Sequence, residues 1–285
     1  MNVLKIAAFS DGTTGGNPAG VLLSDDVLPP VAEMARIAAQ GGISAAVFAV
    51  PETFNESTLR SSYRVRYFSP ESEVPFCGHA TIALGAALTL KKGPGVFTLH
   101  LNHATITVEG HKPDDGLVVA ALQSPPTHSH PATQPLVDAA LTLFGLTASD
   151  LSPDPPPARI HGGADHLLLA LRRRDTLAAM HYDLEEGRKF MHAHGLVTIL
   201  LAFAETPQLF HTRNPFASGG VYEDPATGAA TAALAGYLRD IHWPHQGLID
   251  VVQGEDMGMR SCIRAEFSDV RGSSVRLSGT ARMME

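Results

Sequence analysis

The pattern of hydrophobic and polar positions repeats a short apolar segment in the two halves of the chain. Residues 77–88, CGHATIALGAAL, are matched from residue 228 onward by GAATAALAGYL. At an offset of 150 residues the identical positions of the first copy are Gly78, Ala80, Thr81, Ala83, Leu84 and Leu88. Internal similarity at a fixed spacing indicates that one domain has been duplicated.

Each copy has the composition of a buried helix that begins at glycine. Each follows a strand-like run and a turn rich in Gly or Pro, and continues as an Ala/Leu stretch of high helix propensity. The first helix is predicted to begin near His79, and the second is predicted over residues 227–240. We therefore expect each half to be dominated by strands, with one central helix.

The remaining periodicities predict strands and three further helices. The helices are expected over residues 30–40, 136–143 and 177–193, the first of them ending at Gly41 and Gly42. Strands are expected over residues 3–9, 21–23, 46–50, 63–68, 96–101, 104–109, 116–122, 164–171, 197–204, 248–253, 261–267 and 274–277. The segment SPPTHSHPATQP, residues 124–135, is rich in Pro, Ser and Thr and is expected to connect two domains, residues 1–123 and 124–273.

Composition and charge exclude several classes of function. The chain has 285 residues, 44% of them hydrophobic, which fits two domains with sizeable cores. Its net charge is −8, and no basic run is longer than the three arginines at 172–174, so we expect no nucleic-acid partner. The N-terminus continues directly into a strand and no apolar stretch has membrane-spanning length, so we expect no membrane partner and a cytoplasmic location. Cys77 and Cys262 are too few for a disulfide framework.

Four tracts resemble a known family. GGNPAGVLL, RYFSPESEVPFCGHATIALGAAL, EDPATGAATAAL and QGEDMGMRS occur in the order and spacing typical of the PhzF-like isomerases of phenazine biosynthesis, relatives of diaminopimelate epimerase. The resemblance covers nearly the whole chain. It implies an α+β fold of two pseudo-symmetric domains, each a curved, mostly antiparallel sheet wrapped around a central helix. It also implies that the tail, residues 274–285, packs with the first domain, that the protein is a homodimer, and that a cofactor-free site lies between the domains.

The implied chemistry is proton transfer on a small carboxylated metabolite. Helix N-termini offer backbone N–H groups and positive dipole ends to a substrate carboxylate. Fixed donors of this kind also stabilise the negative charge that is left when a proton is removed beside a carboxylate. A general acid/base must then lie within hydrogen-bond reach of the reacting carbon.

The resemblance also indicates the site residues. The family's acid/base is a glutamate in a Ser-Glu-Thr tract, and the ungapped match places Ala45 at that position. The family's EDPATGS tract supplies an aspartate and a serine; here Asp224 is retained, while Ala229 stands in place of the serine. His79 is retained and is the best remaining titratable partner for Asp224. We therefore expect His79 and Asp224 to be the catalytic residues.

Further residues are expected to bind the substrate. Asn17 shapes the turn before Pro18, and the resemblance places this loop beside the substrate. Thr227 and the glycines of the two helix starts, Gly78 and Gly228, are expected to act through backbone geometry, together with Ala229. Glu71 and Glu73 are ordinary loop acids by position, and either is a candidate to replace the missing glutamate.

Structural roles remain open for the two catalytic candidates. An isolated histidine such as His79 could cap its helix, and Asp224 could serve as a turn or capping residue before Pro225. Two other functions also remain open. One is a catalytically idle carboxylate-binding protein, and the other is an epimerase or racemase that uses Cys77. The second half has Pro225 and Ala226 where a second catalytic cysteine would stand, which argues against a two-cysteine epimerase.

Other chemistries find no support in the motifs. The 14 histidines include no H-E-x-x-H pattern or Cys/His pairing, so we expect scattered surface histidines and no metal site. Neither G-x-G-x-x-G nor a P-loop is present, and no cofactor is expected. The segment GISAA lacks the last glycine of a G-x-S-x-G nucleophile elbow, which argues against a serine hydrolase.

Overall fold

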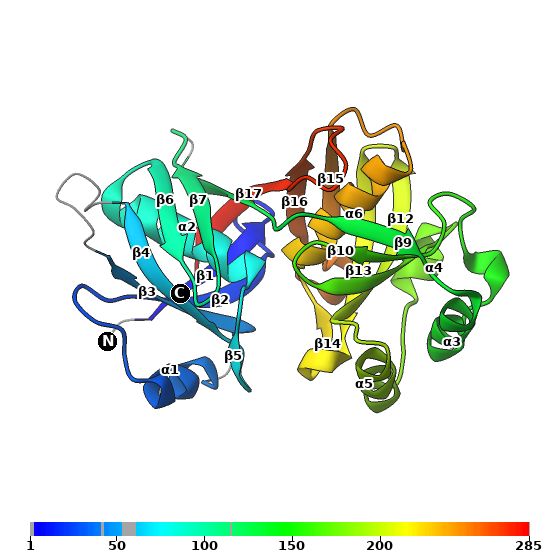
Figure 1. The fold of residues 1–285 in the computed structure, drawn as a ribbon, viewed down its shortest axis with the longest axis horizontal. Helices are drawn as coiled ribbons and strands as arrows, with labels where there is room; N and C mark the ends of the chain where they lie inside the picture. The colour runs from blue at the N-terminus through cyan, green and yellow to red at the C-terminus, as the bar shows by residue number, and fades with distance from the viewer. Residues whose placement is uncertain (1–2, 41–42, 53–60, 115, 285) are drawn as a thin grey trace. The chain divides into compact units, whose positions relative to one another are not determined.

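The computed structural model describes residues 3–40, 43–52, 61–114 and 116–284. The chain forms two compact units, one of residues 1–123 with 278–285 and one of residues 124–277 (Figure 1). The last strand, β17 (Arg276–Met283), crosses the boundary between them. No helix in the described part of the chain has the length and apolar character needed to cross a membrane.

The first unit is a mixed sheet around one helix. Its elements are β1 (Leu4–Ser10), β2 (Asn17–Leu23), α1 (Val31–Ala38), β3 (Ala45–Pro51), β4 (Ser62–Phe68), β5 (Glu73–Val74), α2 (Gly78–Lys92), β6 (Gly95–His100), β7 (Thr105–His111) and β8 (Val118–Gln123). Along the sheet, β1–β2 is antiparallel, β2–β3 parallel, β3–β4 antiparallel, β4–β6 parallel, and β6–β7 and β7–β8 antiparallel. Strand β17 pairs with both β1 and β8, so the strands surround α2.

Helix α2 is the core of the first unit. Residues 79–89 are all buried, and the helix packs against β1, β2, β3, β6, β7 and β8. A helix that is apolar on every side must be buried on every side, which explains why its sequence lacks amphipathic periodicity. Helix α1 covers the outside of the sheet, where Met34 and Ile37 pack with Phe48 and Phe68.

The second unit repeats this architecture. Its elements are β9 (His128–Pro131), α3 (Gln134–Phe144), β10 (Ala158–His161), β11 (Asp165–Ala170), α4 (Arg174–Ala178), α5 (Leu184–Ala193), β12 (Thr198–Thr206), β13 (Leu209–Phe216), β14 (Val221–Asp224), α6 (Gly228–Asp240), β15 (Leu248–Gln253) and β16 (Ser261–Glu266), with 3-10 turns at Ala148–Asp150, Ala217–Gly219 and Glu255–Met257. From β10 to β16 the order of antiparallel and parallel pairings is the same as from β1 to β7.

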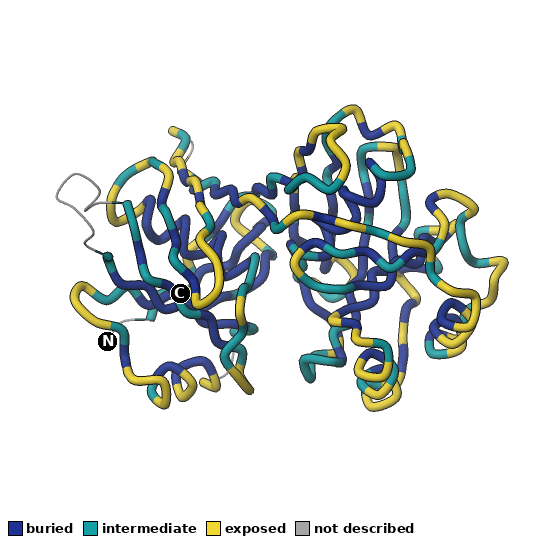
Figure 2. The backbone as a smooth tube through the Cα atoms, viewed as in Figure 1, coloured by how far each residue is buried: buried dark blue, intermediate teal, exposed yellow. Residues whose placement is uncertain are grey.

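Helix α6 takes the place of α2 in the second unit. Its residues 230–239 are buried, and Figure 2 shows the buried central segments of both units in dark blue. The opposite face of the sheet, with Leu167, Leu169 and Leu201, is covered by α3, α4 and α5. The fold is thus the expected α+β class, with a central helix in each of two similar units.

One predicted helix is wrong. Residues 177–193 were expected to form a single helix, but they form the end of α4 and the separate helix α5. The Asp183 side chain accepts a hydrogen bond from the Glu186 backbone N–H at 2.9 Å and so begins a new helix. The Tyr182 hydroxyl donates to the Tyr222 carbonyl, which holds the intervening segment on β14. Gly41 and Gly42, the expected end of the first helix, lie outside the described residues.

Candidate functional site

His79 lies in the first turn of α2. Its side chain is 9% exposed. Cys77, the residue before the helix begins at Gly78, is the N-cap, and its side chain does not cap the helix. The first backbone N–H groups of α2 therefore receive no hydrogen bond from the N-cap side chain. Free N–H groups at the start of a helix are the groups that bind anions.

The imidazole of His79 contacts Ser44, the residue just before β3, and Ser44 in turn contacts Asn17 at the beginning of β2. Its Nε2 lies 2.9 Å from the Ser44 hydroxyl, which donates to Asn17 Oδ1 at 2.7 Å and lies 3.2 Å from the Pro18 carbonyl. Both of these carbonyl oxygens only accept hydrogen bonds, so the Ser44 oxygen must accept from Nε2–H. The network therefore assigns the proton of the neutral imidazole to Nε2 and leaves Nδ1 as the basic nitrogen.

Asn17 reaches this position because of the glycine before it. Gly16 has φ +83°, and a Cβ there would lie 2.9 Å from the Ala8 carbonyl oxygen, so a larger residue would push the two strands apart. Asn17 then begins β2 and is fully buried. The predicted loop residue is thus brought into contact with the Ser44–His79 pair.

Burial determines the charge of His79. It lowers the pKa of the imidazole to about 4, so the side chain is neutral near pH 7. The Cys77 sulfur lies 3.5 Å from Nδ1 and 3.8 Å from Nε2. A neutral imidazole with an unprotonated Nδ1 is a proton acceptor, and Cys77 is the nearest sulfur to it.

Ala45 follows Ser44 at the beginning of β3. It is buried and pairs with Ala19 of β2. The two acids that could replace the missing glutamate do not contact His79. Glu73 is bound to other side chains, and Glu71 is exposed. Glu73 forms an ion pair with Arg66 and accepts from Asn102, and the hydrogen bond from Arg66 lowers the pKa of Glu73. Glu71 is exposed in the turn before β5.

Asp224 ends β14, just before α6, and is 6% exposed. The Thr227 hydroxyl donates to Asp224 Oδ2 at 2.6 Å. The Gln253 amide donates from Nε2 to the Asp224 carbonyl at 2.6 Å and to the Thr227 hydroxyl at 2.9 Å. Gln253 Oε1 accepts from the Thr227 backbone N–H at 3.1 Å. One buried amide thus holds both the carboxylate residue and the residue that precedes α6.

The loop after Gln253 is packed tightly against the Asp224 segment. Gly254 has φ +73°, and a Cβ there would lie 2.5 Å from the Met259 carbonyl oxygen and 2.8 Å from that of Pro225. The tract QGEDMGMRS therefore requires glycine at this point. Gly228 is buried at the start of α6, and Ala229 beside it is half-buried and has no polar side-chain atom.

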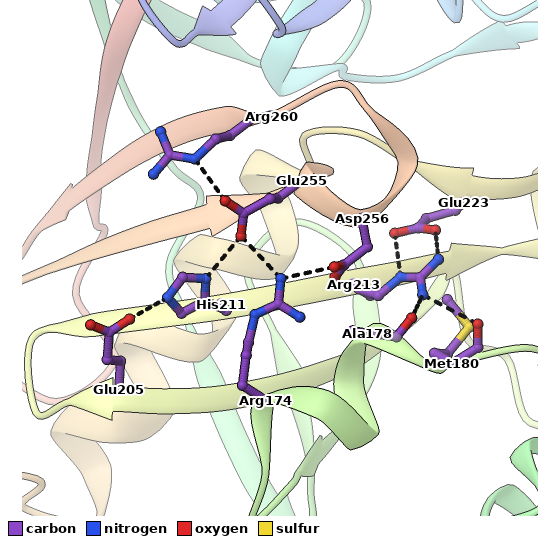
Figure 3. A network of polar contacts seen from close by, with 10 residues as sticks. All are labelled: Arg174, Ala178, Met180, Glu205, His211, Arg213, Glu223, Glu255, Asp256 and Arg260. Carbon is purple, nitrogen blue, oxygen red and sulfur yellow. Dashed lines mark hydrogen bonds and ion pairs between the residues drawn. The ribbon is translucent and has the colours of Figure 1, made fainter.

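A network of ion pairs anchors the same loop (Figure 3). Arg174 of α4 contacts Glu255 at 3.0 Å and Asp256 at 2.9 Å. His211 of β13 lies between Glu205, at 2.6 Å, and Glu255, at 3.5 Å. These contacts tie the 3-10 turn Glu255–Met257 to the sheet and so limit the movement of Gln253 beside it.

A buried ion pair fixes the strand that carries Asp224. Arg213 of β13 donates to both carboxylate oxygens of Glu223, at 3.0 and 2.5 Å, and to the carbonyls of Ala178 and Met180 (Figure 3). The next residues along, Asn214 and Asp224, are directly opposite each other in the β13–β14 ladder. The pair therefore helps to set the register that positions Asp224.

The expectation of scattered surface histidines is wrong in part. His79, His166 and His245 are buried, and burial lowers the pKa of His166 to about 3. Cys262 is half-buried in β16. Across the described ranges, no group of three or more His, Cys, Asp or Glu side chains is arranged to hold a metal ion.

Comparison with known proteins assigns the family. The model of the PhzC-PhzF family, described as phenazine biosynthesis-like protein, matches residues 6–285. The chain belongs to this family. It is 29% identical over 285 residues to a trans-2,3-dihydro-3-hydroxyanthranilate isomerase of Pseudomonas fluorescens, covering 97% of this chain and 93% of that protein. It is 28% identical to an uncharacterized isomerase of Escherichia coli K12, covering 98% and 95%.

Solved structures support the fold of the PhzC-PhzF family. A PhzF-family protein of Bacillus anthracis aligns with a TM-score of 0.83 at 20% identity, covering 99% of this chain and 96% of that chain. A probable proline racemase of Agrobacterium radiobacter aligns with a TM-score of 0.65 at 10% identity, covering 99% and 90%. The relatives in the PhzC-PhzF family are isomerases by name, and the chain is classified as an isomerase with them.

Two contacts of the site were not predicted from the sequence. In the sequence, Ser44 is the serine of the segment GISAA and Gln253 is the first residue of QGEDMGMRS, and neither was expected to contact the site. Their positions in motif tracts were the available signal. Their roles depend on pairings of β2 with β3 and of β13 with β15, which join residues distant in the sequence.

Proposed function

We propose that the protein is a cofactor-independent isomerase that moves a proton on a small carboxylated metabolite. The observation that carries the proposal is repeated in both units: each places one titratable side chain, His79 or Asp224, at the start of its buried central helix. The curated relative acting on trans-2,3-dihydro-3-hydroxyanthranilate supports a cyclic amino acid or hydroxy acid as substrate.

In this proposal His79 is the proton acceptor. Its neutral form is available at pH 7 because burial lowers its pKa to about 4. When Nδ1 takes a proton, the imidazolium keeps its Nε2–H···Ser44 hydrogen bond, which becomes charge-assisted. Asn17 orients Ser44 for this contact. The backbone at Gly78 binds the substrate near the same nitrogen.

Asp224 is proposed to bind and exchange protons with a donor group of the substrate. Its carboxylate is already held by the Thr227 hydroxyl, which can only accept from Gln253 and donate to Asp224 in this geometry. Asp224 is therefore kept as a hydrogen-bond acceptor. Thr227, Gly228 and Ala229 contribute the backbone at the start of α6, where developing negative charge is stabilised.

The alanine at position 45 leads us to expect slower turnover than in a relative that has a glutamate there. We propose that it replaces the family's glutamate, so that turnover relies on His79 and Asp224. A general acid or base typically contributes about 10²- to 10⁴-fold, and turnover should be slower than in a relative with the glutamate by a factor of that order.

Deuterium incorporation tests the activity. The protein would be incubated in heavy water with trans-2,3-dihydro-3-hydroxyanthranilate and a panel of cyclic and amino carboxylic acids, and exchange would be followed by NMR. Exchange into at least one acid, together with a shifted double bond in the dihydro compound, is the expected result. Tight binding of these acids without any exchange would instead identify a carboxylate-binding protein with an idle site.

A second candidate is favoured by the contact between Cys77 and His79. The Cys77 sulfur lies 3.5 Å from Nδ1, so the thiol can donate its proton to the same nitrogen. An epimerase or racemase using Cys77 would lose exchange in Cys77→Ala and after thiol alkylation. Full activity of Cys77→Ala would exclude this function and leave the proton transfer to His79.

A further inference from the structure

Two neighbouring side chains of β13 are buried without hydrogen-bond partners. Thr212 is 3% exposed and Asn214 is fully buried. Within the described residues, Thr212 Oγ1 and both amide atoms of Asn214, Oδ1 and Nδ2, make no hydrogen bond. Buried polar atoms are nearly always paired, because the loss of hydration is otherwise uncompensated. These three atoms are among ten buried side-chain atoms of the described residues without a hydrogen-bond partner, and they keep their capacity to bond a bound molecule.

The two side chains lie on the face of the sheet that carries the Asp224 network. Residues two apart on a strand point to the same side, so Thr212 and Asn214 share a face. Asn214 is directly opposite Asp224 in the antiparallel β13–β14 ladder. Thr212 is directly opposite Gln253 in the parallel β13–β15 ladder. Each unpaired side chain is thus the cross-strand neighbour of one member of the network.

On the opposite face of the same strand Arg213 is paired, whereas His211 Nδ1 makes no hydrogen bond within the described residues and lies 3.5 Å from Glu255. Arg213, between the two residues, points the other way and bonds Glu223 and two backbone carbonyls. Another buried threonine of this sheet, Thr198 of β12, bonds His166 Nδ1 at 2.7 Å. The unpaired state of Thr212 and Asn214 is therefore not common to every buried polar residue of this sheet.

Directly opposite residues have Cβ atoms about 4.5–5.5 Å apart, so the side chains of Asn214 and Asp224 start side by side on one face of the sheet. An amide and a hydroxyl both donate and accept hydrogen bonds. A carboxylate only accepts, whereas a hydroxyl or amino group can donate to Asn214 Oδ1, and a hydroxyl can also accept from its amide. A hydroxyl therefore satisfies both amide atoms of Asn214, whereas a carboxylate, which can accept from Nδ2 and from the Thr212 hydroxyl, leaves Oδ1 unpaired.

We propose that Asn214 and Thr212 determine substrate specificity by binding a hydroxyl or amino substituent next to the substrate's carboxylate. This inference rests on the proposed function, because it assigns these residues to the same site. It predicts that the protein prefers hydroxy or amino acids to the plain acid of the same size. The preference should depend on Asn214 most, because its amide has two unpaired atoms.

Binding measurements on matched variants test the proposal. Dissociation constants of benzoate, anthranilate and 3-hydroxyanthranilate would be measured by calorimetry for the wild-type protein, Asn214→Leu, Thr212→Val and the control Thr198→Val. We expect the wild type to bind the substituted acids about tenfold more tightly than benzoate, the value of a good hydrogen bond. Asn214→Leu should remove this preference and Thr212→Val should reduce it, with the benzoate constant unchanged in both.

Thermal unfolding separates recognition from a structural role. Removing an unsatisfied polar group should leave the Tm unchanged or raise it by about 2–4 °C in Asn214→Leu and Thr212→Val. Thr198→Val should lower the Tm, because it leaves His166 Nδ1 unpaired, and should keep the preference. A lowered Tm in Asn214→Leu together with an unchanged preference would show that the amide holds internal water, and would overturn the proposal.

The outcomes also distinguish this inference from the proposed function. Wild-type protein that binds benzoate as tightly as the substituted acids would contradict the role of Asn214 and leave the carboxylate site standing. Wild-type protein that binds none of the three acids would contradict both.

Discussion

Nε2 of His79 lies 2.9 Å from the hydroxyl oxygen of Ser44. Because the Ser44 proton is directed at carbonyl oxygens of Asn17 and Pro18, this contact makes Nε2 the protonated nitrogen and Nδ1 the basic one. The strand pairing of β2 with β3 thus decides which atom of the imidazole can do chemistry. The tautomer of a catalytic candidate selected by its motif is thus inferred from the hydrogen bonds of Ser44.

Ser44→Ala should slow proton exchange without unfolding the protein. The variant removes the acceptor for Nε2–H, so the imidazolium formed during exchange loses a charge-assisted hydrogen bond and the rate should fall by about 10- to 100-fold. Exchange rates and ¹⁵N chemical shifts of His79 would show the slower reaction and a mixture of tautomers. Ser69→Ala, in the turn before β5, is the control and should react at the wild-type rate. An unchanged rate and tautomer in Ser44→Ala would contradict the assignment.

The stability of the protein should fall as the pH is lowered, because of His166. Burial lowers its pKa in the folded state to about 3, while the unfolded chain takes up the proton near pH 6.5. Below about pH 6.5 the unfolded state therefore binds more protons, and His166 by itself should lower the free energy of unfolding by about 2 kcal/mol between pH 7 and pH 5, in addition to a decrease of the same sign from buried His79. The decrease should continue down to about pH 3.

Denaturant titrations across this range measure the effect. His166→Gln should show a shallower dependence on pH than the wild type, since it cannot take up the proton. His130→Gln, at an exposed histidine, is the control and should follow the wild-type curve. Equal slopes in the wild type and His166→Gln would show that another group causes the pH dependence.

Gln253→Leu should impair both stability and turnover. The change leaves the Thr227 N–H and the Asp224 carbonyl without their buried partner, which should cost about 1–3 kcal/mol of unfolding free energy. It also frees the Thr227 hydroxyl from its donor, so kcat should fall more than KM rises. Gln208→Leu removes a comparable amide from an exposed contact with the Pro244 carbonyl and should change neither quantity. A wild-type kcat in Gln253→Leu would show that Gln253 has no role in turnover.

Removing one partner of the buried Arg213–Glu223 pair should be strongly destabilising, whereas removing both partners should not. Arg213→Met leaves the Glu223 carboxylate buried without its partner, and a loss of about 3–5 kcal/mol is expected. The double variant Arg213→Met with Glu223→Met should recover most of it, because no charge is then left in the interior. Chemical unfolding of the two proteins compares them. Equal losses in the single and double variants would mean that the pair acts through the backbone contacts of Arg213 instead.

The two central helices could be predicted from the sequence almost to the residue. Their Ala/Leu stretches are apolar on every side and follow glycine, and α2 and α6 begin within one residue of the expected positions. The strands β13 and β14 could not be predicted in this way. Their pairing involves the ion pair between Arg213 and Glu223, which lie on either side of a turn. Pro215 lies within β13, although a proline in the sequence usually predicts the end of a strand.

Several residues of the candidate site could be predicted from the sequence, but the hydrogen bonds between them could not. The motifs indicated His79, Asp224 and Asn17, but Ser44 and Gln253 act through strands that are distant in the sequence. A pattern along one chain contains no information on such pairings. The homodimer, the cytoplasmic location and the binding of one substrate by both helix starts stay predictions.

The most direct test of the account is the rate of deuterium exchange in His79→Ala and Asp224→Asn, measured with the acid that the wild-type protein exchanges fastest. Circular dichroism and the Tm would first confirm that both variants are folded. We predict that each variant exchanges at least about 100-fold more slowly than the wild type, since each lacks one acid/base group. Wild-type exchange rates in both folded variants would contradict the account and place the chemistry on other residues.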